Sequence, residues 1–184
     1  MKKKILAISG STRKNSANES ILQTIKDVYS EALDVQLYNS IADLPHFNPD
    51  PYLEEVSPAV VDFRERIDQA DGVIICSPEY VFSLPAVLKN ALEWTVSTIV
   101  FSDKPVALII ASGLGEKAYE QLILIMKTLQ AKIGENATLL LQGARSKVNI
   151  NGKIDDIKTL DDIDLLIRSF VSTIDKGSKL KVES

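Results

Sequence analysis

The residues best suited to bind a ligand near the start of the chain are small, polar and basic. Residues 9–18 read S-G-S-T-R-K-N-S-A-N. Hydroxyl groups, an amide and a fixed guanidinium charge are the groups that hold a phosphate. We expect Arg13 to supply the charge and Gly10 to let the backbone turn. The side chains expected to donate hydrogen bonds to phosphate oxygens are those of Ser11, Ser16 and Asn18.

This stretch matches neither of two common nucleotide-binding loops. It contains no Gly-Lys-Ser/Thr of a Walker loop, and the chain has no G-x-G-x-x-G of a dinucleotide fold. On the residues alone, a second interpretation is equally good: an ordinary strand-to-helix turn whose serine and asparagine side chains only cap the helix. Both interpretations require a strand before the turn and a helix after it.

The flanking residues have the patterns of a strand and a helix. Residues 5–8 form the continuous apolar run that a strand buried on both faces needs. Over residues 17–33, apolar side chains recur at the spacing of one helix face. The polar turn is therefore predicted to lie at a helix N-terminus, where free N–H groups and the helix dipole favour an anion.

Apolar runs alternate with helical patterns along the rest of the chain. The further strands are expected at residues 34–38, 73–76, 105–110 and 138–141. The further helices are expected at residues 57–70, 84–98, 116–133 and 161–174. This alternation predicts an α/β fold, a parallel sheet of five strands with helices on both faces.

Two segments are expected to lack regular structure. Residues 44–52, with three prolines, are predicted to form a long loop, and residues 175–184 are predicted to fray.

Three of the expected loops carry polar or glycine residues and follow strands. They are residues 10–18, 77–83 and 112–115. In parallel sheets, ligands bind beyond the carboxyl ends of the strands, at the point where the strand order reverses. We therefore expect the ligand site where these three loops meet.

Composition narrows the class of protein further. With 184 residues, 45% of them hydrophobic, the chain is suited to form one globular domain. A formal net charge of −4 disfavours nucleic acid as the main partner. No apolar run reaches the roughly 18–20 residues that a membrane span needs. The lone cysteine, Cys76, cannot form an internal disulfide, which suits a cytoplasmic protein.

The most specific pattern follows the third expected strand. Residues 77–94 read S-P-E-Y-V-F-S-L-P-A-V-L-K-N-A-L-E-W. This resembles the signature of the NADPH-dependent FMN reductase family, which is close to P-E-Y-x-x-x-x-P-x-x-L-K-N-A-x-D-W, with Glu93 in place of the aspartate. Residues 10–18 also match the phosphate pattern of that family, G-S-x-R-x-x-S-x-N. The resemblance covers residues 3–143.

The resemblance implies a flavodoxin-like three-layer sandwich with strand order 2-1-3-4-5. The chain would form one FMN-binding domain over residues 1–184. Residues 176–184 are expected to be a disordered tail. It implies an enzyme that takes hydride from NADPH or NADH and passes electrons to a small acceptor: a quinone, a flavin, an azo compound or a metal oxyanion. The flavin carries the chemistry, so no catalytic side chain and no metal is expected. The residues expected to bind FMN are Ser11, Arg13, Ser16, Ala17, Asn18, Pro78, Glu79, Tyr80, Val81, Phe82, Ser112, Gly113, Leu114 and Gly115.

The chain departs from the family pattern at two further positions, and two alternatives to the enzyme are considered. Val81 and Phe82 stand where the family commonly has asparagine or histidine and glycine, so we expect contact through the backbone alone. A flavodoxin-type electron carrier without NAD(P)H turnover, or a domain that has lost its flavin, remains a competing hypothesis.

The resemblance also implies an oligomer. The broad apolar face of residues 119–129 independently predicts a homodimer or homotetramer with each flavin near a subunit boundary.

Overall fold

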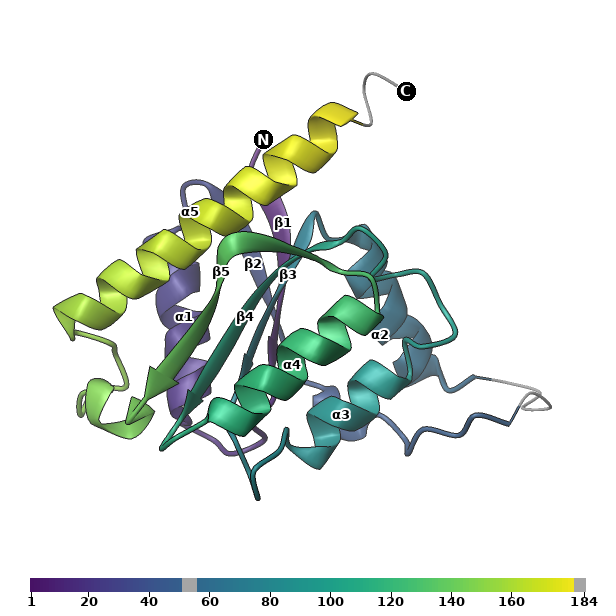
Figure 1. Ribbon diagram of the computed structural model, residues 1–184, viewed down its shortest axis with the longest axis horizontal. Helices are drawn as coiled ribbons and strands as arrows, with labels where there is room; N and C mark the ends of the chain where they lie inside the picture. The colour runs from purple at the N-terminus through teal and green to yellow at the C-terminus, as the bar shows by residue number, and fades with distance from the viewer. Residues whose placement is uncertain (51–55, 181–184) are drawn as a thin grey trace.

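The computed structural model describes residues 1–50 and 56–180, with side chains to residue 177. Its five strands are β1 (Lys3–Ser9), β2 (Leu33–Tyr38), β3 (Gly72–Ser77), β4 (Pro105–Ser112) and β5 (Lys132–Gln142). All neighbouring strands are parallel, and their order is β2-β1-β3-β4-β5 (Figure 1). The predicted fold class and strand order are confirmed.

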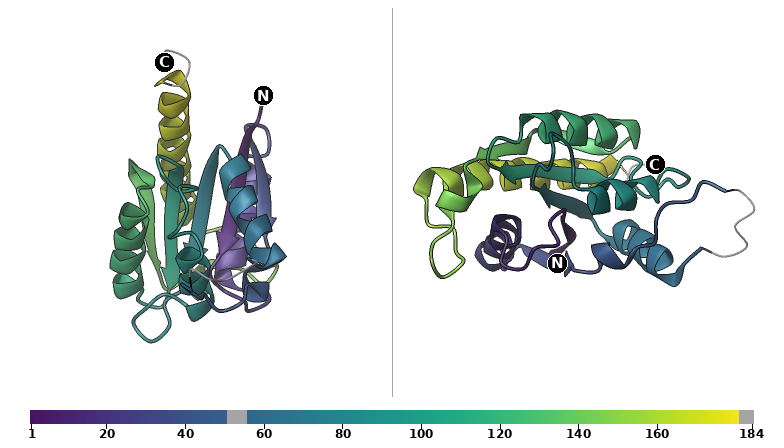
Figure 2. Two further views of the ribbon diagram at one scale, coloured as in Figure 1. Left: turned by 90° about the vertical axis from the view of Figure 1, so that its right-hand side faces the viewer. Right: turned by 90° about the horizontal axis from the view of Figure 1, so that it is seen from below.

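Helices cover both faces of this sheet (Figures 1 and 2). On β1, Leu6 and Ile8 pack into one buried cluster and Ile5 and Ala7 into the other, because alternate side chains of a strand point to opposite faces. The first cluster is completed by α2 (Pro58–Gln69), α3 (Ala86–Glu93) and α4 (Glu116–Thr128). The second is completed by α1 (Ala17–Val28) and α5 (Ile157–Leu180).

Several helices end earlier than predicted. Helix α1 ends at Val28, because the chain turns at Tyr29 and enters β2 at Leu33. Helix α3 ends at Glu93, so residues 94–98 are not part of the helix. Helix α4 ends at Thr128, two residues before Gln130, whose φ of 60° no right-handed helix accommodates. Apolar periodicity continued past each of these ends, which is why the sequence did not reveal them.

Two elements near the C-terminus are longer than predicted. Strand β5 begins at Lys132 rather than at residue 138, and its pairing with β4 shifts between Val106 and Leu108. The polar residues 134–136 hid this part of the strand. Helix α5 runs from Ile157 to Leu180, so the prediction of fraying is wrong for residues 175–180, and residues 181–184 lie outside the described part. No helix in the described ranges combines the length and apolarity that crossing a membrane requires.

Candidate functional site

A cavity of about 470 Å³ opens at the carboxyl edge of the sheet. This volume lies in the range of about 300–1,000 Å³ that is typical of small-ligand sites. The loops after β1, β3 and β4 contribute to its walls, as predicted from the sequence. The predicted residues that line it are Ser11, Arg13, Ser16, Ala17, Asn18, Pro78, Glu79, Tyr80, Ser112 and Gly113.

Four predicted residues do not line this cavity. Val81 and Phe82 form the tip of a two-residue hairpin, closed by hydrogen bonds between the backbones of Tyr80 and Ser83 at 2.9 and 3.0 Å. Their side chains are 95% and 68% exposed. The other two, Leu114 and Gly115, lead into α4, where Gly115 occupies the N-cap position with a φ of 97°. The β3–α3 loop therefore meets the cavity through its first residues, not through its tip.

The structure adds a fourth loop that sequence reasoning missed. After β5, residues 143–146 line the cavity, and residues 144–146 belong to the short 3₁₀ helix η2 (Ala144–Lys147). They belong to a polar connector, residues 142–158, in which the sequence analysis expected no ligand-binding residue. The signal that could have found them is their position: Gly143 and Arg145 follow the fifth strand and must reach the same edge of the sheet as the other three loops.

Gly10 has a different role from the one predicted. Its φ lies outside the left-handed region, so the turn does not require glycine for its backbone angles. A Cβ atom at Gly10 would instead lie 2.4 Å from Ser77 Oγ and 2.8 Å from Ser77 Cβ. The backbone N–H of Gly10 also donates to Cys76 O at 2.8 Å. Glycine is needed because the loop after β1 packs directly against the end of β3.

Two polar side chains of the β1–α1 loop hold the loop itself. Ser16 caps α1, and its Oγ accepts a hydrogen bond from Glu19 N at 3.1 Å. The Asn18 side chain is buried; its Nδ2 donates to Ala111 O, and its Oδ1 accepts from the Cys76 thiol, each at 3.3 Å. Burial raises the pKa of this thiol, so it stays protonated and acts as a donor. The helix-cap interpretation is thus correct for Ser16, and Arg13 is left exposed at the cavity.

Glu79 connects two of the cavity loops. Its backbone N–H donates to Ser112 Oγ at 3.2 Å. Its carboxylate accepts hydrogen bonds from Gly115 N at 3.3 Å and Ala118 N at 3.0 Å, in the first turn of α4. Two N–H groups at the start of α4 are therefore bound by a side chain of the protein and are not directed at a ligand.

Two further residues of the 77–94 motif, Asn90 and Trp94, hold the loop after β2. Asn90 Oδ1 accepts from Phe47 N at 2.7 Å, and its Nδ2 donates to Pro45 O at 2.9 Å. Trp94 Nε1 donates to the same Pro45 oxygen at 2.7 Å, and its ring meets that of Phe47 edge-on at 5.2 Å. These residues position a loop. Part of the predicted loop, residues 51 and 52, lies outside the described residues.

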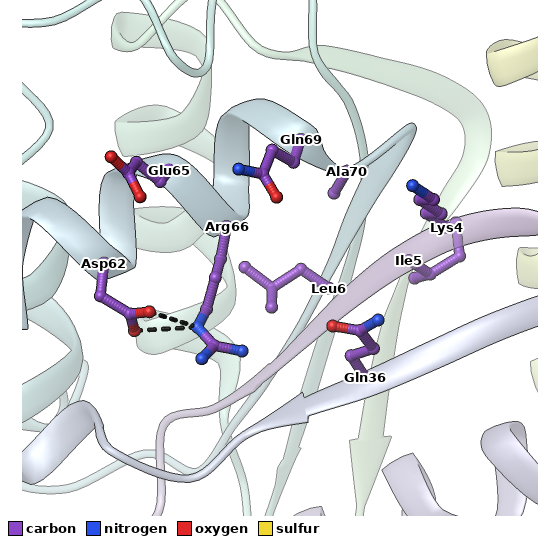
Figure 3. Close-up of a pocket in the computed structure, with 9 residues that line it drawn as sticks. All are labelled: Lys4, Ile5, Leu6, Gln36, Asp62, Glu65, Arg66, Gln69 and Ala70. Carbon is purple, nitrogen blue, oxygen red and sulfur yellow. Dashed lines mark hydrogen bonds and ion pairs between the residues drawn. The ribbon is translucent and has the colours of Figure 1, made fainter.

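A second hollow, of about 270 Å³, lies near the starts of β1 and β2 and beside α2 (Figure 3). Its charged side chains include Arg66 and Asp62, which point toward one another and form an ion pair at 2.8 Å. No residue predicted to bind a ligand lines it. The cavity past the carboxyl ends of the strands is therefore the candidate site.

A parallel sheet in this order, with a cavity where the order reverses beside β1, defines a flavodoxin-like α/β protein with a cavity at its switch point. Residues 3–145 match the family described as NADPH-dependent FMN reductase. The chain belongs to this family, which confirms the resemblance seen in its motifs.

Similar proteins agree with this assignment. The chain is 34% identical over 184 residues to the NADH:(hydroxy)cinnamate reductase subunit CrdA of Vibrio ruber, covering 97% of this chain and 90% of that one. It is 40% identical over 114 residues to an NADPH:quinone oxidoreductase of Arabidopsis thaliana, covering 60% and 58%. The solved structure of FerB, a flavoenzyme NAD(P)H:(acceptor) oxidoreductase from Paracoccus denitrificans, superposes with a TM-score of 0.83 at 26% identity, covering 95% and 98%. The protein is thus an FMN-dependent NAD(P)H oxidoreductase, and nothing supports the electron-carrier alternative.

Proposed function

We propose that the cavity at the carboxyl edge binds FMN and that the enzyme reduces small conjugated acceptors, with quinones as the first class to test. The observation that carries this proposal is the meeting of three predicted loops at one cavity, with the Arg13 guanidinium exposed beside the start of α1. A dianionic phosphate fits such a charge and the N–H groups of a helix N-terminus. FMN, when bound, accepts hydride from NADPH or NADH and transfers two electrons to the acceptor.

The protein's own residues would bind and orient the cofactor. Ser11, Arg13 and the first N–H groups of α1 would hold the phosphate. The buried Pro78 fixes the backbone that follows β3, and Gly113 presents open space where a side chain would otherwise stand. Tyr80, 50% exposed, would cover one side of the flavin ring and leave the other side accessible to nucleotide and acceptor. No side chain need donate or remove a proton.

The test of this site is the FMN affinity of Arg13→Ala, with Lys14→Ala as the control because Lys14 is exposed beside it but does not line the cavity. Loss of a charge-assisted contact should weaken FMN binding by about 1.5–3 kcal/mol. The parent should be yellow, release FMN on denaturation and oxidise NADPH with a quinone. Equal FMN retention in Arg13→Ala and the parent would contradict the assignment.

We propose further that the protein is a cytoplasmic homodimer or homotetramer of single-domain subunits, with each flavin near a subunit boundary. Leu124 on α4 is 66% exposed, and Ile123 and Ile125 beside it are only partly buried. The segment around Pro45, which Asn90 and Trp94 hold by hydrogen bonds, lies next to α3 and is suited to contact a second copy. Light scattering should give a mass of at least twice 20.3 kDa. A flavin-bound monomer would contradict the proposed homo-oligomer. Assembly only with a different chain would also contradict it; the name of the Vibrio ruber relative, a reductase subunit, suggests such an assembly for that protein.

A further inference from the structure

The cavity carries a second arginine, Arg145, that the sequence analysis did not predict. Arg145 lies in η2, past the end of β5, and lines the cavity together with Arg13 from the β1–α1 loop. Both side chains are exposed, and neither has a hydrogen-bond or ion-pair partner among residues 1–50 and 56–177, whose side chains the structure describes.

The other three arginines of the chain are all used within the fold. Arg64 donates to the backbone oxygen of Trp94 at 2.8 Å. Arg66 pairs with Asp62 at 2.8 Å, and Arg168 pairs with Asp164 at 2.6 Å. The two arginines that lack a protein partner in the described ranges thus meet at one cavity, in a chain whose formal net charge is −4. Such a concentration of positive charge favours an anionic ligand.

The carboxylate at this cavity does not cancel that charge by pairing with either arginine. Glu79 is the acidic residue among the lining residues of the described chain, and both of its oxygens accept hydrogen bonds from the start of α4, from Gly115 N and Ala118 N. Its negative charge is stabilised by the helix N-terminus. Arg13 and Arg145 remain available to a ligand.

The fold holds η2 in place beside α1. Gly143 turns the chain with a φ of 63°, and its N–H donates to Gly113 O at 3.2 Å. Ala144 is buried in the cluster that contains the α1 side chains, and Lys147 pairs with Asp156 at 3.1 Å. These contacts fix the backbone on both sides of Arg145, so its side chain enters the cavity from the β5 side, near the start of α1.

We propose that Arg145 is a second phosphate-binding arginine, which lines the same cavity as Arg13 and binds the terminal phosphate of FMN. This inference rests on the proposed FMN site. Two planar guanidinium groups can share the oxygens of one phosphate dianion, each donating paired hydrogen bonds. The 2′-phosphate of NADPH has the same chemistry and could bind the same groups. We assign Arg145 to FMN because η2 packs against α1, whose N-terminus is the proposed position of the FMN phosphate.

The test compares flavins with and without a phosphate. The purified holoenzyme is stripped of flavin and titrated with FMN and with riboflavin, using quenching of flavin fluorescence. In Arg145→Ala, the Kd for FMN should rise at least tenfold while the Kd for riboflavin stays within twofold of the parent value. Lys153→Ala removes the same charge from the same connector, outside the cavity, and should change neither Kd. Arg145→Lys should recover part of the FMN affinity.

Three results would overturn the inference. An equal loss of FMN and riboflavin affinity would mean that Arg145 acts on the flavin ring or on the stability of the fold. The melting temperature of a second variant, Arg145→Gln, distinguishes an effect on the ring from an effect on the fold. Arg145→Gln must also lose affinity for FMN and not for riboflavin. An unchanged FMN affinity with a raised KM for NADPH, but not for NADH, would assign Arg145 to the nucleotide phosphate. A parent protein that binds no FMN would overturn the proposed function itself, which is a distinguishable failure.

Discussion

The carboxylate of Glu79, at the end of β3, accepts a hydrogen bond from the backbone N–H of Ala118, in the first turn of α4, at 3.0 Å. The same carboxylate accepts from Gly115 N at 3.3 Å. A residue of the cavity wall thereby caps the helix that follows the next strand. The acidic member of the P-E-Y motif holds two loops together, and its effect on a ligand is through the position of those loops.

We predict that Glu79→Ala destabilises the protein by about 1–3 kcal/mol, because two partly buried N–H groups of α4 lose their acceptor. Glu79→Gln keeps an acceptor oxygen but loses the charge, so it should cost less, about 0.3–1 kcal/mol. Urea unfolding followed by circular dichroism measures both. The control, Glu120→Gln, removes an exposed ion pair with Lys117 and should cost no more than about 1 kcal/mol. Equal stability of Glu79→Ala and the parent would contradict the capping role.

Gly10→Ala should destabilise the protein by about 1–3 kcal/mol, the usual cost of overpacking. The added methyl group would lie 2.8 Å from Ser77 Cβ, which cannot move without shifting β3. Gly113→Ala is the matched control, because a Cβ there meets nothing within 4 Å and its φ is not left-handed. Thermal unfolding should therefore separate the two variants clearly. If Gly10→Ala melts with the parent, close packing is not what requires this glycine.

The two glycines and the arginines illustrate what could be predicted from the sequence. The continuous apolar run of β1 and the turn after it predicted the strand, the helix start and the part of the cavity wall formed by Ser11, Arg13, Ser16, Ala17 and Asn18. The need for Gly10 could not be predicted, because it depends on a contact with Ser77, which is remote in the sequence. Arg145 was missed for a different reason: the residues after the fifth strand match no ligand-binding motif, although residues that follow any strand of this sheet reach the edge where the cavity lies.

The hairpin tip at Val81 and Phe82 is strained. Their φ values are 52° and 54°, a conformation that favours asparagine and glycine and that a β-branched residue rarely adopts. Both side chains are exposed, so replacing them sacrifices little packing. The double variant Val81→Asn/Phe82→Gly should therefore be more stable than the parent by about 1–2 kcal/mol, as judged by its urea midpoint.

A valine with ordinary backbone angles provides the control for this gain. Val96 is 64% exposed and is not among the residues with positive φ. Val96→Asn should leave stability within about 0.5 kcal/mol of the parent. A gain of the same size at both positions would show that removing an exposed apolar side chain, and not relief of backbone strain, is the cause.

The last prediction concerns pH and the start of α5. Asp156 precedes Ile157 and its Oδ2 accepts hydrogen bonds from Thr159 Oγ1, from Lys147 Nζ at 3.1 Å and from Thr159 N at 2.9 Å. The Thr159 hydroxyl, then Lys147 and the Thr159 N–H, lower the pKa of Asp156 from 3.8 to about 2. A carboxyl group whose pKa is lower in the folded state stabilises the fold above its ordinary pKa, and this stabilisation is lost as the pH falls toward the folded value.

Asp156→Asn should therefore have a lower melting temperature than the parent at pH 7, since asparagine can cap the helix but carries no charge for Lys147. The difference should stay constant down to about pH 5, shrink between about pH 4 and pH 2, and be smallest at the acid end of that window. Asp161→Asn, at an exposed position in α5, should show no such convergence with the parent. Melting curves of parent and Asp156→Asn that remain equally separated from pH 7 to pH 2 would show that the Asp156 charge does not stabilise the junction between η2 and α5.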